Sequence, residues 1–418
     1  MINTITLDNG IKIVYEKMDH LQTVAFGVFF RTGSIDEPPE LYGASHFIEH
    51  MMFKGTDKHS AKEIADAFDE LGGSVNAYTT RDHTCYYFKT TSETFLPAAE
   101  IMCEMLTKSL FDEKEIEKER QVILEEIKMI DDQPDELAME NCSRLVFKGD
   151  LLEHDVAGDP EALAGQTGAK LKEYIKREYT CDSIVVAVAG NFNHDEVIEL
   201  VEKRLTSFER KKDKVIDSLV PYQPGRITIC KDIEQTNLCI GTRFVTLGSD
   251  EYFAAAFFNN ILGGSMSSRL FQNIREEKGL AYTIVSMPQI MARSGMLMVY
   301  AGIAHNKISE CLDAVHHELD LIGTQGISKE ELQKAKNQGK SSVVFSMERT
   351  QSRMMSIGRN LLLLDRVYEQ EEVLALMTGV TIEEVNQLAH QVTKDMPFSY
   401  AAVTPKTLNF EKLIGSQV

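Results

Sequence analysis

Two histidines, His46 and His50, lie four residues apart in the stretch His46-Phe47-Ile48-Glu49-His50. In a helix, side chains at this spacing lie on one face, so both imidazoles can bind a single metal ion. The carboxylate of Glu49 can reach a water held by that metal without being a ligand itself. These residue types suit metal-assisted hydrolysis with the glutamate as general base. The alternative is a polar helix surface, because short patterns also arise by chance.

The neighbouring residues predict that this helix, over residues 46–53, is buried. Ser45 or a turn at Gly43 can cap its start, and Lys54-Gly55 is typical of a helix end. The flanking side chains are apolar, namely Phe47, Ile48, Met51, Met52 and Phe53. Histidines in such surroundings need partners, because unsatisfied buried polar groups are unfavourable. The metal-binding interpretation is therefore favoured over a polar surface.

A third ligand is expected from another helix, because a catalytic zinc requires three protein ligands and one open position. Residues 112–130 have a helical pattern with an apolar stripe through Ile116, Ile123, Ile127 and Ile130. At about 100° per residue, Glu119 and Glu126 fall within about 60° of the centre of that stripe. We expect Glu126 to be the third ligand and Glu119 to support a ligand or the water. A salt-bridged helix face is a nearly equal alternative for Glu119.

With these residues identified, the chain resembles the pitrilysin-type inverzincin zinc metallopeptidases, in the bacterial branch similar to the β subunit of mitochondrial processing peptidase. Four stretches in the same order carry the resemblance, at residues 43–56, 73–79, 119–126 and 267–282. It implies one Zn²⁺ per chain bound by His46, His50 and Glu126, with Glu119 as a helper acid. The expected activity is a zinc-dependent endopeptidase.

The resemblance also implies a catalytic contribution from the second half of the chain. Arg275 would orient the substrate, and the hydroxyl of Tyr282 would stabilise the developing oxyanion. From the sequence alone, the stronger interpretation of Arg275 is an ion pair with Glu276 or Glu277 on a helix surface. The resemblance favours the catalytic role.

A glycine-introduced strand follows the histidine helix, and family members use it to hold substrate. We expect Asn76, Ala77 and Tyr78 to bind an extended peptide through an exposed sheet edge. An ordinary core strand is nearly as well supported by the residues themselves. The resemblance further implies a homodimer that encloses a chamber, with Arg275 and Tyr282 acting on the partner's metal site. The alternative functions are a non-catalytic structural or regulatory subunit and a peptide-binding chaperone chamber.

Composition narrows the possible partners and the compartment. The net charge of −20 argues against nucleic acid, and it suits either cationic peptides or a solvated acidic surface. The seven scattered cysteines predict reduced thiols without a disulfide framework. The first residues show no secretory or transit signal, and we find no apolar run of ~18 residues, so we expect a cytoplasmic protein without a membrane span.

The chain reads as two copies of one plan, which predicts an α+β fold of two homologous domains, each a mainly antiparallel sheet packed with helices. The expected domains are residues 1–209 and 225–418, joined by a linker at 210–224, and the second copy lacks the metal motif. The expected strands are 10–18, 24–32, 74–79, 84–91 and 183–190, then 226–231, 238–245, 281–287, 295–303 and 399–403. The expected helices are 46–53, 61–71, 93–110, from 113 onward and 195–208, then 252–262, 268–277, 307–323, 329–341 and segments through 364.

Overall fold

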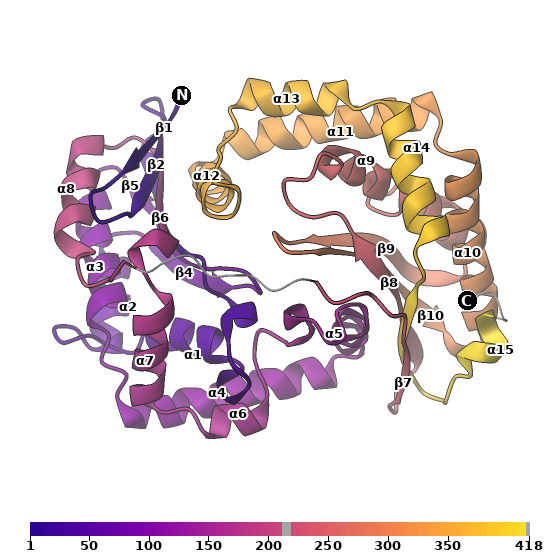
Figure 1. Ribbon diagram of the computed structural model, residues 1–418, viewed down its shortest axis with the longest axis horizontal. Coiled ribbons are helices and arrows are strands. Elements are labelled where there is room, and N and C mark those ends of the chain that lie inside the picture. The colour runs from indigo at the N-terminus through magenta and orange to yellow at the C-terminus, as the bar shows by residue number, and fades with distance from the viewer. Residues whose placement is uncertain (211–218, 415–418) are drawn as a thin grey trace. The chain divides into compact units, whose positions relative to one another are not determined.

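The structure, a computed structural model, describes residues 1–210 and 219–414 (Figure 1). It divides into two compact units, each assembled from separate segments of the chain. The first unit contains residues 1–127, 154–217 and 344–370. The second contains residues 128–153, 218–343 and 371–418. Each unit is built around one sheet with its own apolar core.

The first unit has a six-stranded sheet in the order β1-β2-β6-β3-β5-β4. Its strands are β1 (Ile2–Thr6), β2 (Lys12–Lys17), β3 (Thr23–Phe30), β4 (Ser74–Thr79), β5 (Thr84–Thr91) and β6 (Ile184–Gly190). Strands β2 and β6 are parallel, and the other pairs are antiparallel. Strand β4 is at the edge of this sheet, with β5 as its neighbour.

Helices pack on both faces of the first sheet, which explains why β3 is buried at every residue after Thr23. The helices are α1 (Ala44–Met51), α2 (Ala61–Glu70), α3 (Phe95–Lys108), α4 (Glu113–Asp132), α6 (Pro160–Ala164), α7 (Gly168–Glu178), α8 (His194–Arg204) and α12 (Thr350–Leu364). On β3, Phe26 packs against Phe95 of α3. Phe29, which points to the opposite face, lies beside Gly358 of α12.

The second unit repeats the plan with five strands in the order β7-β11-β8-β10-β9. These are β7 (Arg226–Cys230), β8 (Gln235–Phe244), β9 (Ala281–Ile290), β10 (Gly295–Ala304) and β11 (Ser399–Thr404). The order matches β2-β6-β3-β5-β4, and β7 with β11 repeats the single parallel pair. The predicted α+β class with two similar, mainly antiparallel sheets is therefore confirmed.

The remaining helices belong mainly to the second unit. They are α5 (Pro134–Val146), α9 (Tyr252–Leu262), a π-helix (Phe271–Glu277), α10 (Ile308–Gln325), α11 (Lys329–Met347), α13 (Gln370–Gly379), α14 (Ile382–His390) and α15 (Phe410–Ile414). The sequence patterns missed α5, α6 and α7 in the first half and α13, α14 and α15 in the second. The predicted helix at residues 46–53 ends earlier, at Met51.

Each half of the chain contributes one helix to the other half's sheet. Helix α5 packs on β8, β10 and β11, whereas α12 packs on β2, β3 and β6. The predicted boundaries at residues 1–209 and 225–418 remain a prediction about homology, because the compact units are not contiguous in sequence. Residues 211–218 of the expected linker lie outside the described residues.

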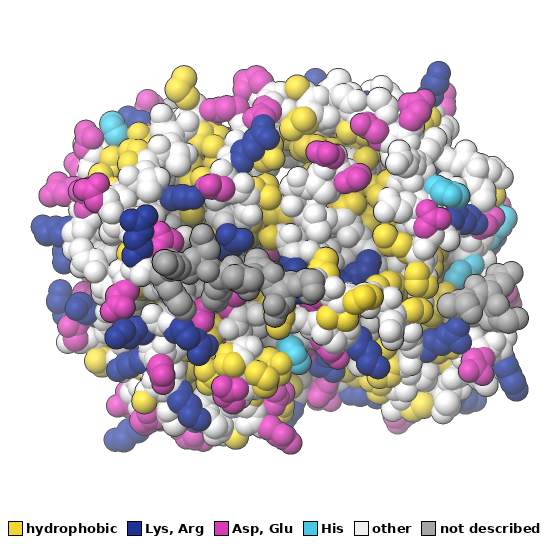
Figure 2. Space-filling model, viewed as in Figure 1, with side chains coloured by type: hydrophobic (Ala, Val, Ile, Leu, Met, Phe, Trp, Pro, Cys, Tyr) yellow, Lys and Arg dark blue, Asp and Glu magenta, His cyan; other side chains and the backbone are white. Residues whose placement is uncertain are grey.

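Charged side chains of both signs are mixed over the visible surface (Figure 2), as on an ordinary solvated protein. The cysteines are free thiols, and most of them are buried. Figure 2 shows Lys and Arg side chains standing among Asp and Glu side chains over the visible face. All seven cysteines are unbridged, and Cys230 is the exposed one. None of the helices within residues 1–210 and 219–414 combines the length and apolar character needed to cross a membrane.

The close contact between α12 and the first sheet generates a stability prediction. A Cβ added at Gly358 would meet the ring of Phe29 and would lie 2.8 Å from the Cβ of Ala187. We expect Gly358→Ala to lower the free energy of unfolding by about 1–3 kcal/mol, because overpacking outweighs the gain in helix propensity. The control is Gly379→Ala in α13, where a Cβ meets nothing within 4 Å. Urea titrations of both variants measure the difference, and equal stabilities would contradict this packing account.

Candidate metal centre

The start of α1 is fixed by a buried carboxylate rather than by a conventional cap. Gly43 precedes the helix with φ of 90°, a left-handed conformation that suits glycine. Glu37 accepts hydrogen bonds from the backbone N–H groups of Gly43 (2.6 Å) and Ser45 (2.7 Å). Ser45 itself lies inside the helix, with its hydroxyl 3.2 Å from that of Tyr174. Of the two helix starts that the sequence offered, Ser45 or a turn at Gly43, the structure has the turn at Gly43.

Helix α1 buries its apolar side and turns both histidines toward α4. Phe47, Ile48 and Met51 are buried in the core of the first unit. The side chains of His46 and His50 are 19% and 17% exposed, and their ring centroids are 4.7 Å apart. Spacing by one helical turn produces this pairing, as the sequence predicts.

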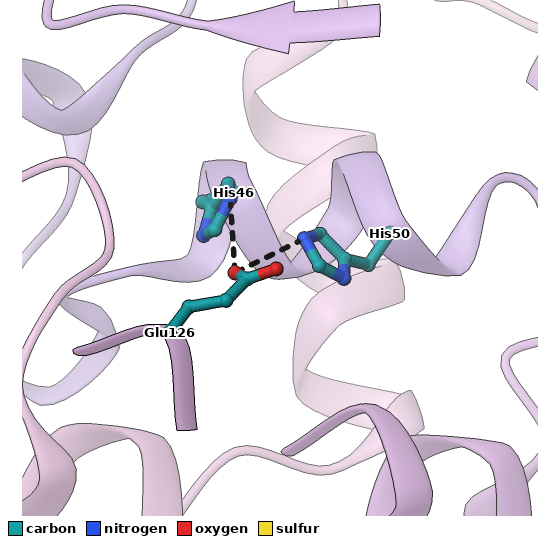
Figure 3. A group of neighbouring side chains, drawn as sticks. All are labelled: His46, His50 and Glu126. Atoms are coloured by element: carbon teal, nitrogen blue, oxygen red, sulfur yellow. Dashed lines mark ion pairs between the residues drawn. The ribbon is translucent and has the colours of Figure 1, made fainter. Parts of the chain in front are cut away.

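Helix α4 places Glu126 between the two imidazoles (Figure 3). Its Oε2 lies 3.8 Å from Nε2 of His46 and 3.6 Å from Nε2 of His50. The three side chains each offer one ligand atom, and these atoms all lie within 4.8 Å of one another. The Glu126 side chain is 40% exposed, more than its place near the centre of the apolar stripe implied, although its direction toward the histidines agrees with that projection.

Glu119 lies two turns before Glu126 on α4 and contacts the other side of His50. Its Oε2 is 3.2 Å from Nδ1 of His50, and its Oε1 is 2.6 Å from Nζ of Lys54. Glu119 therefore matches both interpretations from the sequence. It contacts the candidate ligand His50, and it forms a salt bridge with Lys54. With Nδ1 of His50 directed at a carboxylate, Nε2 carries the lone pair available to a metal.

Glu49 lies on α1 between the two histidines, and its side chain is hydrogen-bonded to the neighbouring strand. The hydroxyl of Thr79, at the end of β4, donates to Oε2 of Glu49 at 2.5 Å. Burial raises the pKa of Glu49, and the Thr79 hydrogen bond opposes that shift. A raised pKa makes the carboxylate a stronger proton acceptor.

The donor set fits a bound cation better than a hydrogen-bonded cluster. Burial, with a smaller effect from His50, lowers the pKa of His46 to about 4, so this imidazole is neutral at neutral pH. Nδ1 of His46 is buried without a hydrogen-bond partner among the described residues. Two imidazoles and one carboxylate directed at one point are ligand types that zinc binds. His46, His50 and Glu126 could therefore hold this metal.

The predicted substrate-binding residues lie on β4, which is an edge strand as the sequence suggested. Asn76 Oδ1 accepts a hydrogen bond from the backbone N–H of Ala77 at 2.8 Å. The hydroxyl of Tyr78 lies 3.2 Å from Nε2 of His83 and 3.8 Å from Sδ of Met355. The side chain of Tyr78 is thus engaged within the first unit, and burial raises its pKa above the usual range.

Arg275 and Tyr282 belong to the second unit and not to the unit that contains the histidines. The Arg275 guanidinium lies over the ring of Phe271, and its Nε is 3.8 Å from Oε1 of Glu276. The ion pair that the sequence offered as the alternative is therefore present, with the Arg275 side chain 43% exposed. Tyr282, at the start of β9, is 61% exposed. Their catalytic roles stay predictions.

Sequence reasoning missed Glu37, Lys54 and Thr79 as neighbours of the site. Helical periodicity identifies which face of α1 or α4 a residue occupies, but it does not identify the partner that meets that face. Lys54 was seen only as a helix-end cation, and Thr79 only as part of a strand. The one available signal for Glu37 is its position before the Gly43 turn, where an acidic side chain favours a helix start.

Glu37 makes stability depend on pH. Burial raises the pKa of Glu37 to about 8, against the opposing effect of its hydrogen bonds from Ser45 and Gly43. A folded-state pKa above the unfolded value gives a contribution to stability that is full below the unfolded pKa and is lost as pH rises through the folded pKa. We expect wild type to lose a few kcal/mol relative to Glu37→Gln between about pH 5 and about pH 8.5.

Chemical denaturation of both proteins at the two pH values measures this difference. Glu40→Gln, at an exposed carboxyl group nearby, is the matched control and should follow wild type. If the stability of wild type relative to Glu37→Gln stays constant, or rises with pH, Glu37 is charged throughout this range.

The sequence of this chain matches two related family models. One, described as insulinase (peptidase family M16), matches residues 12–159, and the other, described as the peptidase M16 inactive domain, matches residues 167–338. The uncharacterised zinc protease YmxG of Bacillus subtilis (strain 168) is 39% identical over 406 residues, which are 97% of this chain and 98% of that protein. An uncharacterised zinc protease of Rickettsia felis is 33% identical over 410 residues, covering 97% of this chain and 98% of its own.

Solved structures share the fold at lower sequence identity. A protease from Helicobacter pylori superposes with a TM-score of 0.88 at 21% identity, covering 97% of this chain and 99% of that one. A chain of complex III2 from Candida albicans superposes with a TM-score of 0.84 at 17% identity, covering 98% of each chain. The sequence relationships extend over nearly the full length of the chain, including both of its compact units. The chain belongs to peptidase family M16, the insulinase family.

Proposed function

We propose that this chain is a zinc-dependent endopeptidase that hydrolyses peptide bonds in extended peptides. The observation that carries the proposal is the convergence of the ligand atoms of His46, His50 and Glu126 within 4.8 Å of one another. Glu49 lies on the same helix as the two histidines. Membership of a family whose relatives are named zinc proteases supports the same metal. One Zn²⁺ per chain would be held by these three side chains. When bound, zinc polarises the scissile carbonyl and lowers the pKa of a water toward about 7.

Glu49 is the general base and then the general acid of this proposal. Its carboxylate takes a proton from the attacking water and delivers it to the leaving amine. The hydrogen bond from Thr79 holds Oε2 of Glu49. The other carboxylate oxygen of Glu49 is therefore presented by a side chain of fixed orientation. Glu119 supports the ligand His50 by accepting a hydrogen bond from its Nδ1, the ring nitrogen that does not face the metal.

The peptide would lie along the free edge of β4, held by main-chain hydrogen bonds. Because the Ala77 N–H bonds to the Asn76 side chain, an arriving strand would exchange that local bond for one of its own. Ala77 would supply the main-chain bonds, because Tyr78 pairs with Cys85 of β5 and its hydroxyl is engaged with His83. Thr79, the last residue of the same strand, bonds to Glu49, so substrate binding and the proton acceptor share one element.

The second unit would complete the site from a partner chain. In this proposal a homodimer in the cytoplasm encloses a chamber, and Arg275 and Tyr282 assist at the partner's metal site. The high exposure of Tyr282 leaves its hydroxyl accessible to a substrate. The net charge of −20 supports a preference for cationic peptides.

A non-catalytic peptide-binding subunit is the second candidate, because a chain of complex III2 from Candida albicans shares this fold. The two candidates differ in metal and in turnover. A structural subunit would bind peptides equally well after chelation, whereas the proposed peptidase requires zinc and Glu49 for cleavage.

Replacement of the general base separates cleavage from metal binding. We expect Glu49→Gln to reduce kcat by at least about 10²-fold while one zinc per chain is retained, because Glu49 moves protons but does not hold the metal. Cleavage of a mixed peptide library, read by mass spectrometry, gives the rate, and elemental analysis gives the zinc. Glu125→Gln, an exposed neighbour of Glu126, is the control with the same chemical change. Unchanged cleavage in Glu49→Gln, or cleavage that survives chelation, would overturn the enzyme proposal.

Mixing two inactive chains tests the action of Tyr282 in trans. A Glu49→Gln chain still carries Tyr282, and a Tyr282→Phe chain still carries Glu49, so a mixed dimer has one complete site. We expect the equimolar mixture to recover about one quarter of wild-type activity, because half of randomly exchanged dimers are mixed and each has one working site. Mixing Glu49→Gln with the doubly substituted chain is the control and should restore nothing. Activity no higher than the sum of the parent chains would exclude the arrangement in trans.

A further inference from the structure

Lys54 sits behind the candidate metal centre at a position that no catalytic role requires. It follows α1 one helical turn after His50, where its backbone N–H donates to the carbonyl of Met51 at 3.1 Å. Gly55 then turns the chain with φ of 112°. The end of the helix therefore holds the Lys54 backbone in place, and its side chain is 29% exposed.

The side chain of Lys54 meets the same carboxylate that supports His50. Nζ of Lys54 lies 2.6 Å from Oε1 of Glu119, and Nδ1 of His50 lies 3.2 Å from Oε2. Each oxygen of Glu119 thus has one partner, and both partners come from α1 or its end. The Glu119 side chain is only 8% exposed, and a carboxylate so enclosed is unfavourable without an opposite charge.

This arrangement gives Lys54 an effect on the ligand that it does not touch. By occupying Oε1, the ammonium group fixes the rotation of the Glu119 carboxylate and keeps Oε2 directed at His50. A carboxylate in that position orients the imidazole and increases its basicity toward a metal on the other nitrogen. Nε2 of His50 faces Glu126 at 3.6 Å. The contacts therefore form one chain from Lys54 through Glu119 to His50 and the ligand group.

We propose that Lys54 is a positioning residue that sets the zinc affinity of the site by holding Glu119 against His50. The inference rests on the proposed function, because it concerns the zinc site that the peptidase would use. In this arrangement Lys54 aligns the Glu119 carboxylate, and the Glu119 carboxylate aligns the imidazole of the ligand His50.

The test measures zinc affinity by competition with a chromophoric chelator, independently of peptide cleavage. We expect Lys54→Met to weaken zinc binding by about 10-fold or more, within the range seen when such supporting groups are removed. Lys54→Arg keeps a cation at this position and should restore most of the affinity. Lys58→Met is the matched control, because Lys58 is 61% exposed and lies beside Glu104, not Glu119.

A double-substitution cycle establishes whether Lys54 acts through Glu119. In a Glu119→Gln background, Lys54→Met should cause little further loss of zinc affinity, because the link to His50 is already removed. Equal affinities of wild type and Lys54→Met, or full additivity of the two losses, would overturn the inference. Circular dichroism of the metal-free proteins checks folding, and Lys54→Arg supplies a comparison if Lys54→Met is unstable. Failure of wild type to bind one zinc per chain would instead overturn the proposed function.

Discussion

The central constraint in this protein is that two helices must bring the lone pairs of two imidazole nitrogens and one carboxylate oxygen to one point. No hydrogen bond joins these three atoms to relieve their mutual repulsion. His46 and His50 come from α1 and Glu126 comes from α4, and their ligand atoms lie within 4.8 Å of one another. Such a group is unfavourable unless each supporting contact is fixed. Glu37 holds the start of α1, Lys54 and Glu119 hold its end, and Thr79 holds Glu49. The rest of the first unit keeps these contacts in register.

The sequence predicted the parts of this centre that depend on local periodicity. A spacing of four placed the histidines together, and the helical projection directed Glu119 and Glu126 to the same side of α4. The projection overestimated the burial of Glu126, because a helix face can point at a partner and still border solvent. It did not identify Glu37 or the link between Lys54 and Glu119. Those contacts join residues far apart in sequence, and only the packing of α1 against α4 and its neighbours creates them.

The fold was predictable to a similar depth. Most strands and the repetition of the plan were readable, because buried strands carry continuous apolar runs and the order of elements recurs. The sequence did not predict that α5, from the first half of the chain, packs on the second sheet, or that α12, from the second half, packs on the first. Both helices are amphipathic, and amphipathicity shows that a helix packs on something without showing which sheet it covers. The glycines at positions 27 and 358, which let α12 approach β3, gave the only local sign of that contact.

The two units share one order of strands, and the candidate metal ligands lie in the first unit. Helix α9 follows β8 as α1 follows β3, but its apolar side chains fill the core of the second unit. The measurement that tests the account most directly is anomalous diffraction at the zinc edge from crystals grown with one equivalent of zinc. The account predicts one peak per chain, bonded to Nε2 of His50, to His46 and to the Glu126 carboxylate. A peak bonded to other side chains, or zinc bound without Glu126, would contradict it.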